Sequence, residues 1–242
     1  MAVIARAAPS WELTLLNCWQ LSLDGEAASV SSRQQRLITA LALAGTRSRT
    51  YFANLLWPDC SESQAAGSLR ASLHAITHQQ PGLLHPSSNP LALDPSVVVD
   101  VNRVRRTIAE IDRLHSVGVD AIHDLRGADL LPDWYEDWVL FERERLDSQR
   151  LLALETLAEH YLAIADIGRA LDAASAAVEI EPLRESSHLL LARCHLALGN
   201  SAAAMRLYHS LEERLLEEMS IAPSPRFAEL LDGVLTSRHA RR

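Results

Sequence analysis

The feature that most constrains the fold of this chain is an internal repeat in its second half. The sequence from residue 158 aligns without gaps with the sequence from residue 192, an offset of 34 residues. The matched pairs are Ala158 with Ala192, Tyr161 with His195, Ala165 with Gly199, Asp166 with Asn200, Ala170 with Ala204 and Ala174 with Tyr208. Small residues that recur at this spacing predict closely crossing helices, stacked in pairs that bury their apolar positions against their neighbours.

A 34-residue period is typical of tetratricopeptide repeats. Pro182 lies where the first repeat should end, whereas Leu216 occupies the equivalent position of the second, so we expect the second repeat to end irregularly. Tyr161, His195 and Tyr208 lie on these repeats and are candidate partner-binding residues. The alternative for Tyr161 is a place in the core between stacked helices.

The segment that precedes the repeats is also predicted to be helical. Val104, Ile108 and Ile111 recur at the spacing of one helix face. An acidic and aromatic stretch follows, in which Trp134 and Trp138 are candidate anchors for a partner protein. Packing between helices is the commoner use of such a cluster. Residues 102–242 are therefore predicted to form one all-helical domain of tetratricopeptide type.

The first hundred residues show a different pattern. Trp11–Leu16 and Trp19–Leu23 alternate apolar and polar residues, and the Asp24-Gly25 pair that follows is typical of a hairpin turn. A helix is predicted to begin at Ser31 or Ser32, which serve as an N-cap, and to end at Gly45.

Two more helices and a second hairpin complete this region. The second helix is expected over roughly Thr50–Trp57, and the third begins at Ser61 or Ser63 with Leu69, Leu73 and Ile76 on one buried face. Short strands around a tip at Pro86–Pro90, with a further strand at Val97–Val101, follow. Strands, three helices and a terminal hairpin predict a winged helix over residues 1–101, whose third helix enters the DNA major groove. The whole chain is predicted to be mainly α with a small β component.

Composition limits the function classes. The 242 residues carry 23 basic residues, all arginine, against 31 acidic ones, a net charge of −8. Because the bulk charge is acidic, any DNA-binding surface must be local and lie in the near-neutral first hundred residues. No apolar run approaches the ~20 residues that cross a bilayer, and no secretory signal is evident. The three cysteines lack metal-ligand spacing, which favours a reducing cytoplasm and predicts no metal and no cofactor.

Enzymatic motifs are not found either. The sequence contains no HExxH, GxSxG, P-loop or GxGxxG motif, so we expect no catalytic residues. His74 and His78 are spaced one helical turn apart, but two ligands alone make a weak metal site.

Candidate DNA-binding residues gather on two helices and the segment between them. On the third helix, Arg70, His74, Thr77 and His78 are predicted to share the face opposite the apolar stripe, with Ser68 nearby, and such side chains can contact base edges or phosphates. The arginines suited to phosphate contact are Arg33, Arg36, Arg47 and Arg49. The alternative for both groups is an ordinary solvated surface.

The order of these parts resembles the SARP family, the Streptomyces antibiotic regulatory protein type of bacterial activator, over roughly residues 11–235. The residues that carry the resemblance are Ser32–Leu37, Leu55–Trp57, Ser68–Arg70, Val99–Val101, Leu125–Gly127, Asp137–Trp138, Glu142–Leu146, Pro182–Glu185 and Pro223–Pro225. The resemblance implies a winged-helix DNA-binding domain joined to a bacterial transcriptional activator domain of tetratricopeptide-like helices. Where this family usually carries further arginines at the end of the third helix, the chain has Leu73–Gln80, and the tip Pro86–Pro90 has none.

Two functions remain open. The first is a cytoplasmic transcriptional regulator, expected to be an activator, that docks on double-stranded promoter DNA. Its helical domain would hold RNA polymerase, another regulator or a second protomer, with no membrane involved. The second is an adaptor that no longer binds DNA and acts through its helical repeats, which the acidic repeats and the arginine-poor third helix favour.

Overall fold

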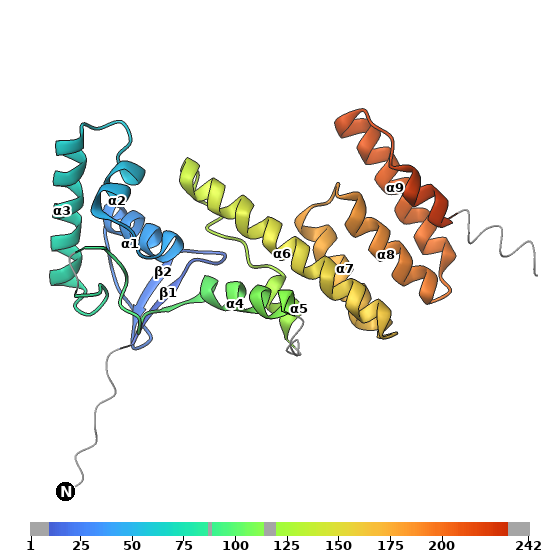
Figure 1. Cartoon of the computed structure of the whole chain (residues 1–242), viewed down its shortest axis with the longest axis horizontal. Coiled ribbons are helices and arrows are strands. Elements are labelled where there is room, and N and C mark those ends of the chain that lie inside the picture. The colour runs from blue at the N-terminus through green and yellow to red at the C-terminus, as the bar shows by residue number, and fades with distance from the viewer. Residues whose placement is uncertain (1–9, 87–88, 114–119, 232–242) are drawn as a thin grey trace, which may run out of the picture. The chain divides into compact units, whose positions relative to one another are not determined.

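The computed structural model describes residues 10–86, 89–113 and 120–231, which are mainly helical with one small sheet (Figure 1), as the sequence predicted. They form two compact units: Met1–Arg103 with Ala128–Glu144, and Val104–Gly127 with Arg145–Arg242. These units and the predicted domains 1–101 and 102–242 divide the chain differently, and the domain boundaries stay a prediction. Among the described residues, no helix is both long enough and apolar enough to cross a bilayer.

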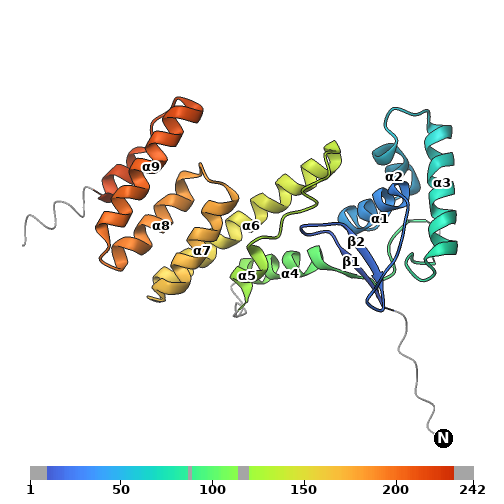
Figure 2. The ribbon, with the colours of Figure 1, turned by 180° about the vertical axis from the view of Figure 1, so that it is seen from behind.

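The sheet of the first unit has the strand order β3-β2-β1-β4, and Figure 2 shows β1 and β2 side by side. Its strands are β1 (Trp11–Thr14), β2 (Gln20–Leu23), β3 (Glu26–Ala27) and β4 (Val98–Val99). β1 pairs antiparallel with β2 and parallel with β4, and β2 pairs antiparallel with β3. Asp24 and Gly25 have φ values of 52° and 86°, the left-handed conformations that a tight hairpin turn needs. The predicted hairpin turn is thus confirmed.

Local capping explains where the helices of the first unit begin. They are α1 (Ser32–Ala44), α2 (Arg49–Leu56) and α3 (Glu62–Gln79). Ser31 and Ser61 each accept a hydrogen bond from the backbone N–H three residues on, and the side-chain oxygens of Gln34 and Gln64 accept one from the backbone N–H of the cap residue. Such a cap stabilises a helix by about 1 kcal/mol. α1 ends at Gly45, whose φ of 67° most side chains avoid.

The core of the first unit lies between the sheet and these helices. β1 alternates buried Trp11 and Leu13 with more exposed residues, which turns one face of the sheet toward the helices. The fully buried apolar side chains include Leu13, Leu15, Leu21, Leu37, Ile38, Phe52, Leu56, Leu69 and Ile76. Because Leu69 and Ile76 are buried in this core, the polar face of α3 is turned toward solvent.

The wing is the hairpin around the predicted tip Pro86–Pro90, and its two sides pair as the sequence predicted. Leu84 and Leu93 form an antiparallel bridge, and part of the tip, residues 87–88, lies outside the described residues. The expected strand Val97–Val101 is wrong in part, because only Val98–Val99 is a strand and a helix begins at Asp100. The Asp100 carboxylate accepts hydrogen bonds of 2.9–3.0 Å from the backbone of Leu15 and Leu16. These bonds tie the first turn of that helix to the end of β1.

Segment 128–144 belongs to the first unit because it pairs with the end of β1. Leu131 donates a backbone hydrogen bond of 3.0 Å to Leu15, and Asn17 donates one of 2.7 Å to Asp129. The Arg143 guanidinium holds the turn that follows by donating to the carbonyl oxygens of Leu130, Leu131 and Trp134. One arginine thus satisfies three carbonyl groups of an otherwise irregular loop.

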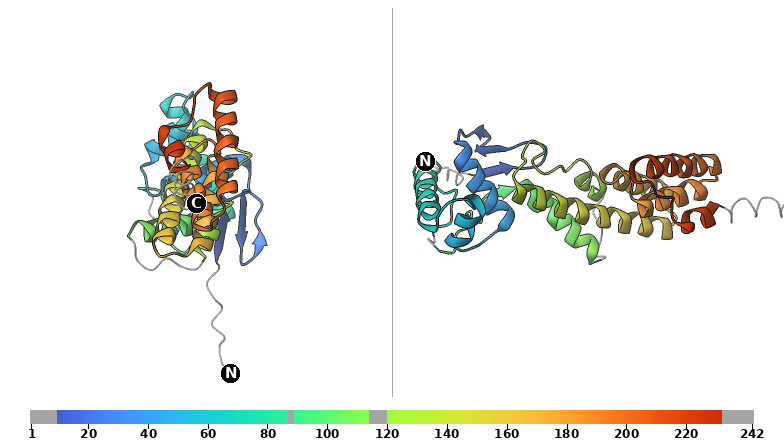
Figure 3. Two further views of the ribbon diagram at one scale, coloured as in Figure 1. Left: turned by 90° about the vertical axis from the view of Figure 1, so that its right-hand side faces the viewer. Right: turned by 90° about the horizontal axis from the view of Figure 1, so that it is seen from above.

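The second unit is helical. Its helices include parts of α4 (Asp100–Asp112) and α6 (Asp137–Ala163), together with α5 (Ala121–Leu125), α7 (Ile167–Ile180), α8 (Glu185–Ala197) and α9 (Ser201–Met219). α8 packs against α7 on one side and α9 on the other, and α8 and α9 lie side by side in Figure 1 and in the right-hand view of Figure 3. A helical segment at 225–231 adds Phe227 and Leu231 to the core beside α9.

The repeat is visible in the backbone. Asp166 and Asn200, 34 residues apart, are both N-caps whose side chains accept a backbone hydrogen bond three residues on. The residues before them, Ala165 and Gly199, both have positive φ, 59° and 73°. α7 ends two residues before Pro182, whereas α9 continues to Met219. The irregular end of the second repeat is therefore confirmed.

Candidate nucleic-acid interface

One face of α3 is polar and exposed. Leu69, Leu73 and Ile76 are 2%, 7% and 0% exposed and face the core. The predicted residues Arg70, His74, Thr77 and His78 are all exposed, and Ser68 is half-buried. The division follows from the 3.6-residue period, which puts each polar residue about a quarter to half a turn from the apolar stripe. An exposed face of this kind is what a helix needs to contact base edges.

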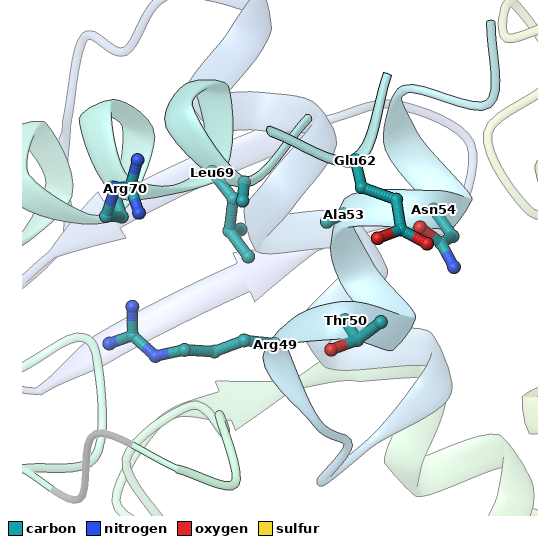
Figure 4. Close-up of a pocket in the computed structure, with 8 residues that line it drawn as sticks. Arg49, Thr50, Ala53, Asn54, Glu62, Leu69 and Arg70 are labelled. Carbon is teal, nitrogen blue, oxygen red and sulfur yellow. The ribbon is translucent and has the colours of Figure 1, made fainter. Parts of the chain in front are cut away.

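Arg49 joins this face from α2. A hollow of about 240 Å³ between α2 and α3 is lined by Arg49, Thr50, Asn54, Leu69 and Arg70, among others. Figure 4 shows the guanidinium groups of Arg49 and Arg70 on the same side of this hollow. Two guanidinium groups on one side suit a phosphate oxygen, which each can bind through several N–H donors. Glu62 lies on the other side, near Asn54 (Figure 4).

A second hollow lies between α3 and the wing. It has a volume of about 200 Å³, and its lining includes Arg49, Thr77, His85 and Leu91. Arg47 exchanges two backbone hydrogen bonds with Leu91, of 3.2 and 2.8 Å, so it is held at the base of the wing. The structure therefore brings Arg49, Arg70 and Thr77 together around two hollows that share Arg49, whereas the Arg47 guanidinium lies elsewhere, donating to the Thr46 carbonyl at 3.1 Å. His85 was missed, because a single histidine in a Pro-rich turn gives no pattern.

Arg36 is engaged within the first unit. Its Nε lies 2.8 and 2.9 Å from the two carboxylate oxygens of Glu136, and its Nη2 donates to the carbonyl of Leu56 at 3.0 Å. Its side chain is 31% exposed. A phosphate contact by Arg36 would have to compete with this ion pair. Arg33, three residues earlier on α1, is exposed.

The two histidines of α3 are stacked. The ring centres of His74 and His78 lie 4.3 Å apart with an interplanar angle of 39°. Thr77 donates its hydroxyl hydrogen to the Leu73 carbonyl at 2.9 Å, which leaves the oxygen free to accept. Among the described residues no group of three or more His, Cys, Asp and Glu is arranged to hold a metal ion.

Asp94 places a negative charge at the stem of the wing. Asp94 accepts hydrogen bonds from the Ser96 hydroxyl at 2.6 Å and the Ser96 amide at 3.0 Å. These two bonds, the hydroxyl first, hold the pKa of Asp94 below its usual value. The group is therefore charged at neutral pH and repels a phosphate that approaches from that side.

The candidate partner-binding residues divide between the units. Trp134 and Trp138 lie in the first unit and are half-buried, with the Trp138 indole donating to Glu136 at 2.7 Å. Tyr161 lies in the second unit, is only 4% exposed and has the Arg169 guanidinium 4.8 Å from its ring centre. Tyr161 thus lies in the core, and little of its ring faces solvent.

His195 and Tyr208, on α8 and α9, are half-buried. Tyr208 packs edge-on against Phe227, with ring centres 5.2 Å apart. Its hydroxyl lies 3.5 Å from a Glu212 oxygen. Tyr208 therefore belongs to the packing between α9 and the segment 225–231, and contact of either residue with a partner stays a prediction.

The sequence is similar to that of known bacterial proteins. Residues 99–235 match the family described as "Bacterial transcriptional activator domain". The chain is 27% identical over 227 residues to the regulatory protein AfsR of Streptomyces coelicolor, covering 88% of this chain and 23% of that protein. It is 26% identical over 249 residues to AfsR of Streptomyces griseus, covering 96% of this chain and 25% of that protein. The chain therefore spans about a quarter of the length of these relatives.

A solved structure shares the fold. Mycobacterium tuberculosis EmbR, determined in complex with a low-affinity phosphopeptide, superposes with a TM-score of 0.71 at 18% identity. The match covers 95% of this chain and 66% of that one. Because the family match takes in more than half of the chain, the protein belongs to the bacterial transcriptional activator domain family, and the resemblance to the SARP type is confirmed.

Proposed function

We propose that the first unit binds double-stranded promoter DNA in the cytoplasm, with α3 in the major groove. Arg70 would contact a base edge, because a guanidinium can donate two hydrogen bonds to guanine O6 and N7. His74, Thr77, His78 and Ser68 would contact neighbouring base edges or the sugar-phosphate backbone. The remaining arginines would act on phosphates: Arg33, Arg47 and Arg49, with Arg36 in a lesser role because it is paired with Glu136.

The observation that carries this proposal is the cluster of Arg49 and Arg70 beside the exposed face of α3. Both cations come from elements whose other faces are fixed by the core, so their positions are set before DNA arrives. Prearranged donors lose less conformational freedom on binding than donors on mobile loops. The exposed α3 face supplies base contacts and the arginine pair supplies electrostatic affinity.

We further propose that the protein activates transcription by recruitment. The helical repeats would hold RNA polymerase, another regulator or a second copy of the chain. A partner held beside a promoter reaches a high effective concentration there without any chemical step. Residues 1–101 and 102–242 are proposed as the two functional domains.

The experiment that tests DNA binding is selection of duplexes from genomic DNA by the purified chain, followed by anisotropy on the selected sequence over a range of salt concentrations. We expect one enriched motif and a log–log salt slope of about −3 to −4, because three to four arginine–phosphate contacts release that many counterions. A folded protein that enriches nothing at low salt contradicts the proposal.

The adaptor function is favoured by two observations: Arg36 is already paired with Glu136, and Asp94 carries a negative charge at the wing stem. It predicts no enriched motif and a partner protein that binds the repeats. The two functions therefore separate in the same selection experiment, since only the regulator enriches DNA.

A further inference from the structure

A groove in the first unit shares no lining residue with the two hollows beside α3. It has a volume of about 350 Å³ and lies between the C-terminal half of α1, α2 and the start of α6. Its residues are mainly apolar or aromatic, with two carboxylates; they are Ala40, Leu43, Ala44, Tyr51, Leu55, Asp137, Trp138, Phe141 and Glu142. All of them belong to one compact unit, so the groove is a feature of that unit alone.

The walls of the groove stand exposed at the surface. Phe141 is 65% exposed and Tyr51 is 41% exposed, although aromatic side chains of this size usually bury most of their area. A small-molecule site normally buries about 70–90% of the surface of its ligand. Walls as open as these would leave most of a small ligand in contact with solvent. An open apolar groove between helices is instead the shape that accepts one face of a partner helix.

The charges of the groove differ between its walls. Asp137 and Glu142 line the wall formed by α6. α1 ends at this groove and has no basic residue in its last turn, so its C-terminal dipole adds partial negative charge beside Leu43 and Ala44. On the α2 wall, the Arg47 guanidinium carbon lies 5.8 Å from the centre of the Tyr51 ring. A ligand thus meets acidic charge along the α6 and α1 sides and one cation beyond Tyr51.

We propose that this groove binds an amphipathic helix of a partner protein, with apolar side chains inserted beside Phe141 and with arginine or lysine facing Asp137 and Glu142. The apolar anchors would supply most of the affinity, since buried aromatic and aliphatic contacts at the centre of an interface dominate its energy. The acidic wall would select a basic helix and orient it. The groove is therefore a second protein-binding surface, separate from the helical repeats.

The test uses the full chain and three fluorescein-labelled helical peptides of equal length. The first carries leucines at i, i+4 and i+7 with arginines on one flank, the second replaces the arginines by glutamate, and the third replaces the leucines by glutamine. We expect the first peptide to bind and the other two to bind at least tenfold more weakly. In the chain, Phe141→Ala should weaken binding of the first peptide about tenfold, and Asp137→Asn about threefold.

Two matched variants control for these changes. Tyr135→Ala removes an aromatic ring that is 77% exposed and does not line the groove, and Asp133→Asn removes an exposed carboxylate outside it. Both should bind the first peptide as the unchanged chain does. Equal binding of the basic and acidic peptides, no binding of either, or no effect of Phe141→Ala overturns the proposal. Self-association of the chain that Phe141→Ala abolishes would also overturn it, because the groove would then hold a second copy.

Discussion

The paired arginines of the second unit and the exposed arginine of α3 differ in their contacts. In the second unit, Arg150 is 1% exposed and pairs with Asp147, and Arg184 pairs with Glu155 at 3.0 Å. On α3 in the first unit, Arg70 is exposed, and the residues one and two turns along the same face are His74, Thr77 and His78 rather than carboxylates. Guanidinium groups that pair inside a unit stabilise it, whereas an exposed guanidinium on a fixed helix face is available to a partner.

This difference shows why net charge alone misleads. The chain carries a charge of −8, which argues against DNA binding in bulk. Yet several arginines of the second unit form ion pairs with acidic neighbours, as Arg126 does with Asp172 and Glu179. What matters to a ligand is the charge left at the surface it approaches, because exposed charges beyond about 10 Å are screened by salt.

The largest expected effect is a loss of stability when the buried arginine of the second unit, Arg150, is removed. Arg150→Ala should lower the free energy of unfolding by about 3 kcal/mol, since it removes a buried cation and leaves the Leu125 carbonyl without its 2.8 Å donor. For a chain of this size the thermal midpoint should fall by about 6–12 °C. Circular dichroism during heating measures it. Arg193→Ala, at an exposed arginine of α8, is the control. Equal midpoints for the two variants would contradict a structural role for Arg150.

The next largest expected effect is a loss of DNA affinity when Arg70 is removed. Arg70→Ala should reduce affinity for the selected duplex by about tenfold to a hundredfold, because a bidentate contact with a base is worth about 1–3 kcal/mol. Its thermal midpoint should stay within about 2 °C of the unchanged chain, since Arg70 is exposed and lies outside the buried stripe. Anisotropy on the selected duplex and on a scrambled one measures it. Unchanged affinity in a folded variant excludes Arg70 from the interface, and Arg193→Ala is again the control.

The sequence predicts well what depends on residues close together along the chain. Ser31 with Gln34 and Ser61 with Gln64 fix the starts of α1 and α3 within three residues. The 34-residue offset likewise identifies Asp166 as the equivalent of Asn200, and both are caps. These features need no knowledge of the tertiary fold, because each hydrogen bond closes within one turn.

Prediction fails where a polar side chain makes contacts far along the chain. Val97–Val101 is rich in β-branched residues and favours a strand, but the Asp100 carboxylate bonds to backbone 84 and 85 residues away and starts a helix. The ion pair between Arg36 and Glu136 spans 100 residues. Nothing in the local sequence of Arg36 distinguishes it from Arg33, so both were assigned to phosphate contact. The groove beside Phe141 was missed for the same reason, because its walls come from distant segments.

A smaller expected effect is a loss of stability of the second unit as the pH falls. Burial lowers the pKa of His188, whose Nε2 lies 3.0 Å from the Pro182 carbonyl. Since the unfolded chain binds a proton more readily there, stability is complete above about pH 6.5 and falls as the pH drops below it. Unfolding in urea at pH 7.5 and 5.5 should show this loss, and His188→Leu should reduce it. His160→Gln, at an exposed histidine of α6, should leave the pH dependence unchanged. If His188→Leu loses as much stability between pH 7.5 and 5.5 as the unchanged chain does, the loss arises from other groups.

Glu155 acts in the same direction at lower pH. Its burial by itself would raise its pKa, but hydrogen bonds from Arg184, Ser186 and Ser187 together outweigh burial and lower it. The stability that it contributes is present above about pH 4.5 and lost as the pH falls through its lowered pKa. Measurements between pH 7.5 and 5.5 therefore isolate His188 from Glu155.

The smallest expected effect concerns the two histidines of α3. His74 and His78 are exposed and stacked on the helix that is proposed to enter the major groove. If both contact base edges or phosphate oxygens, the double variant His74→Ala with His78→Ala should bind the selected duplex about threefold to tenfold more weakly, because each exposed contact of this kind contributes a fraction of a kcal/mol to about 1 kcal/mol. Anisotropy on the selected duplex measures this loss. His160→Ala in the second unit should bind as the unchanged chain does, because its ring lies outside the first unit. Unchanged affinity in the double variant would limit direct contact on α3 to Arg70 and Thr77.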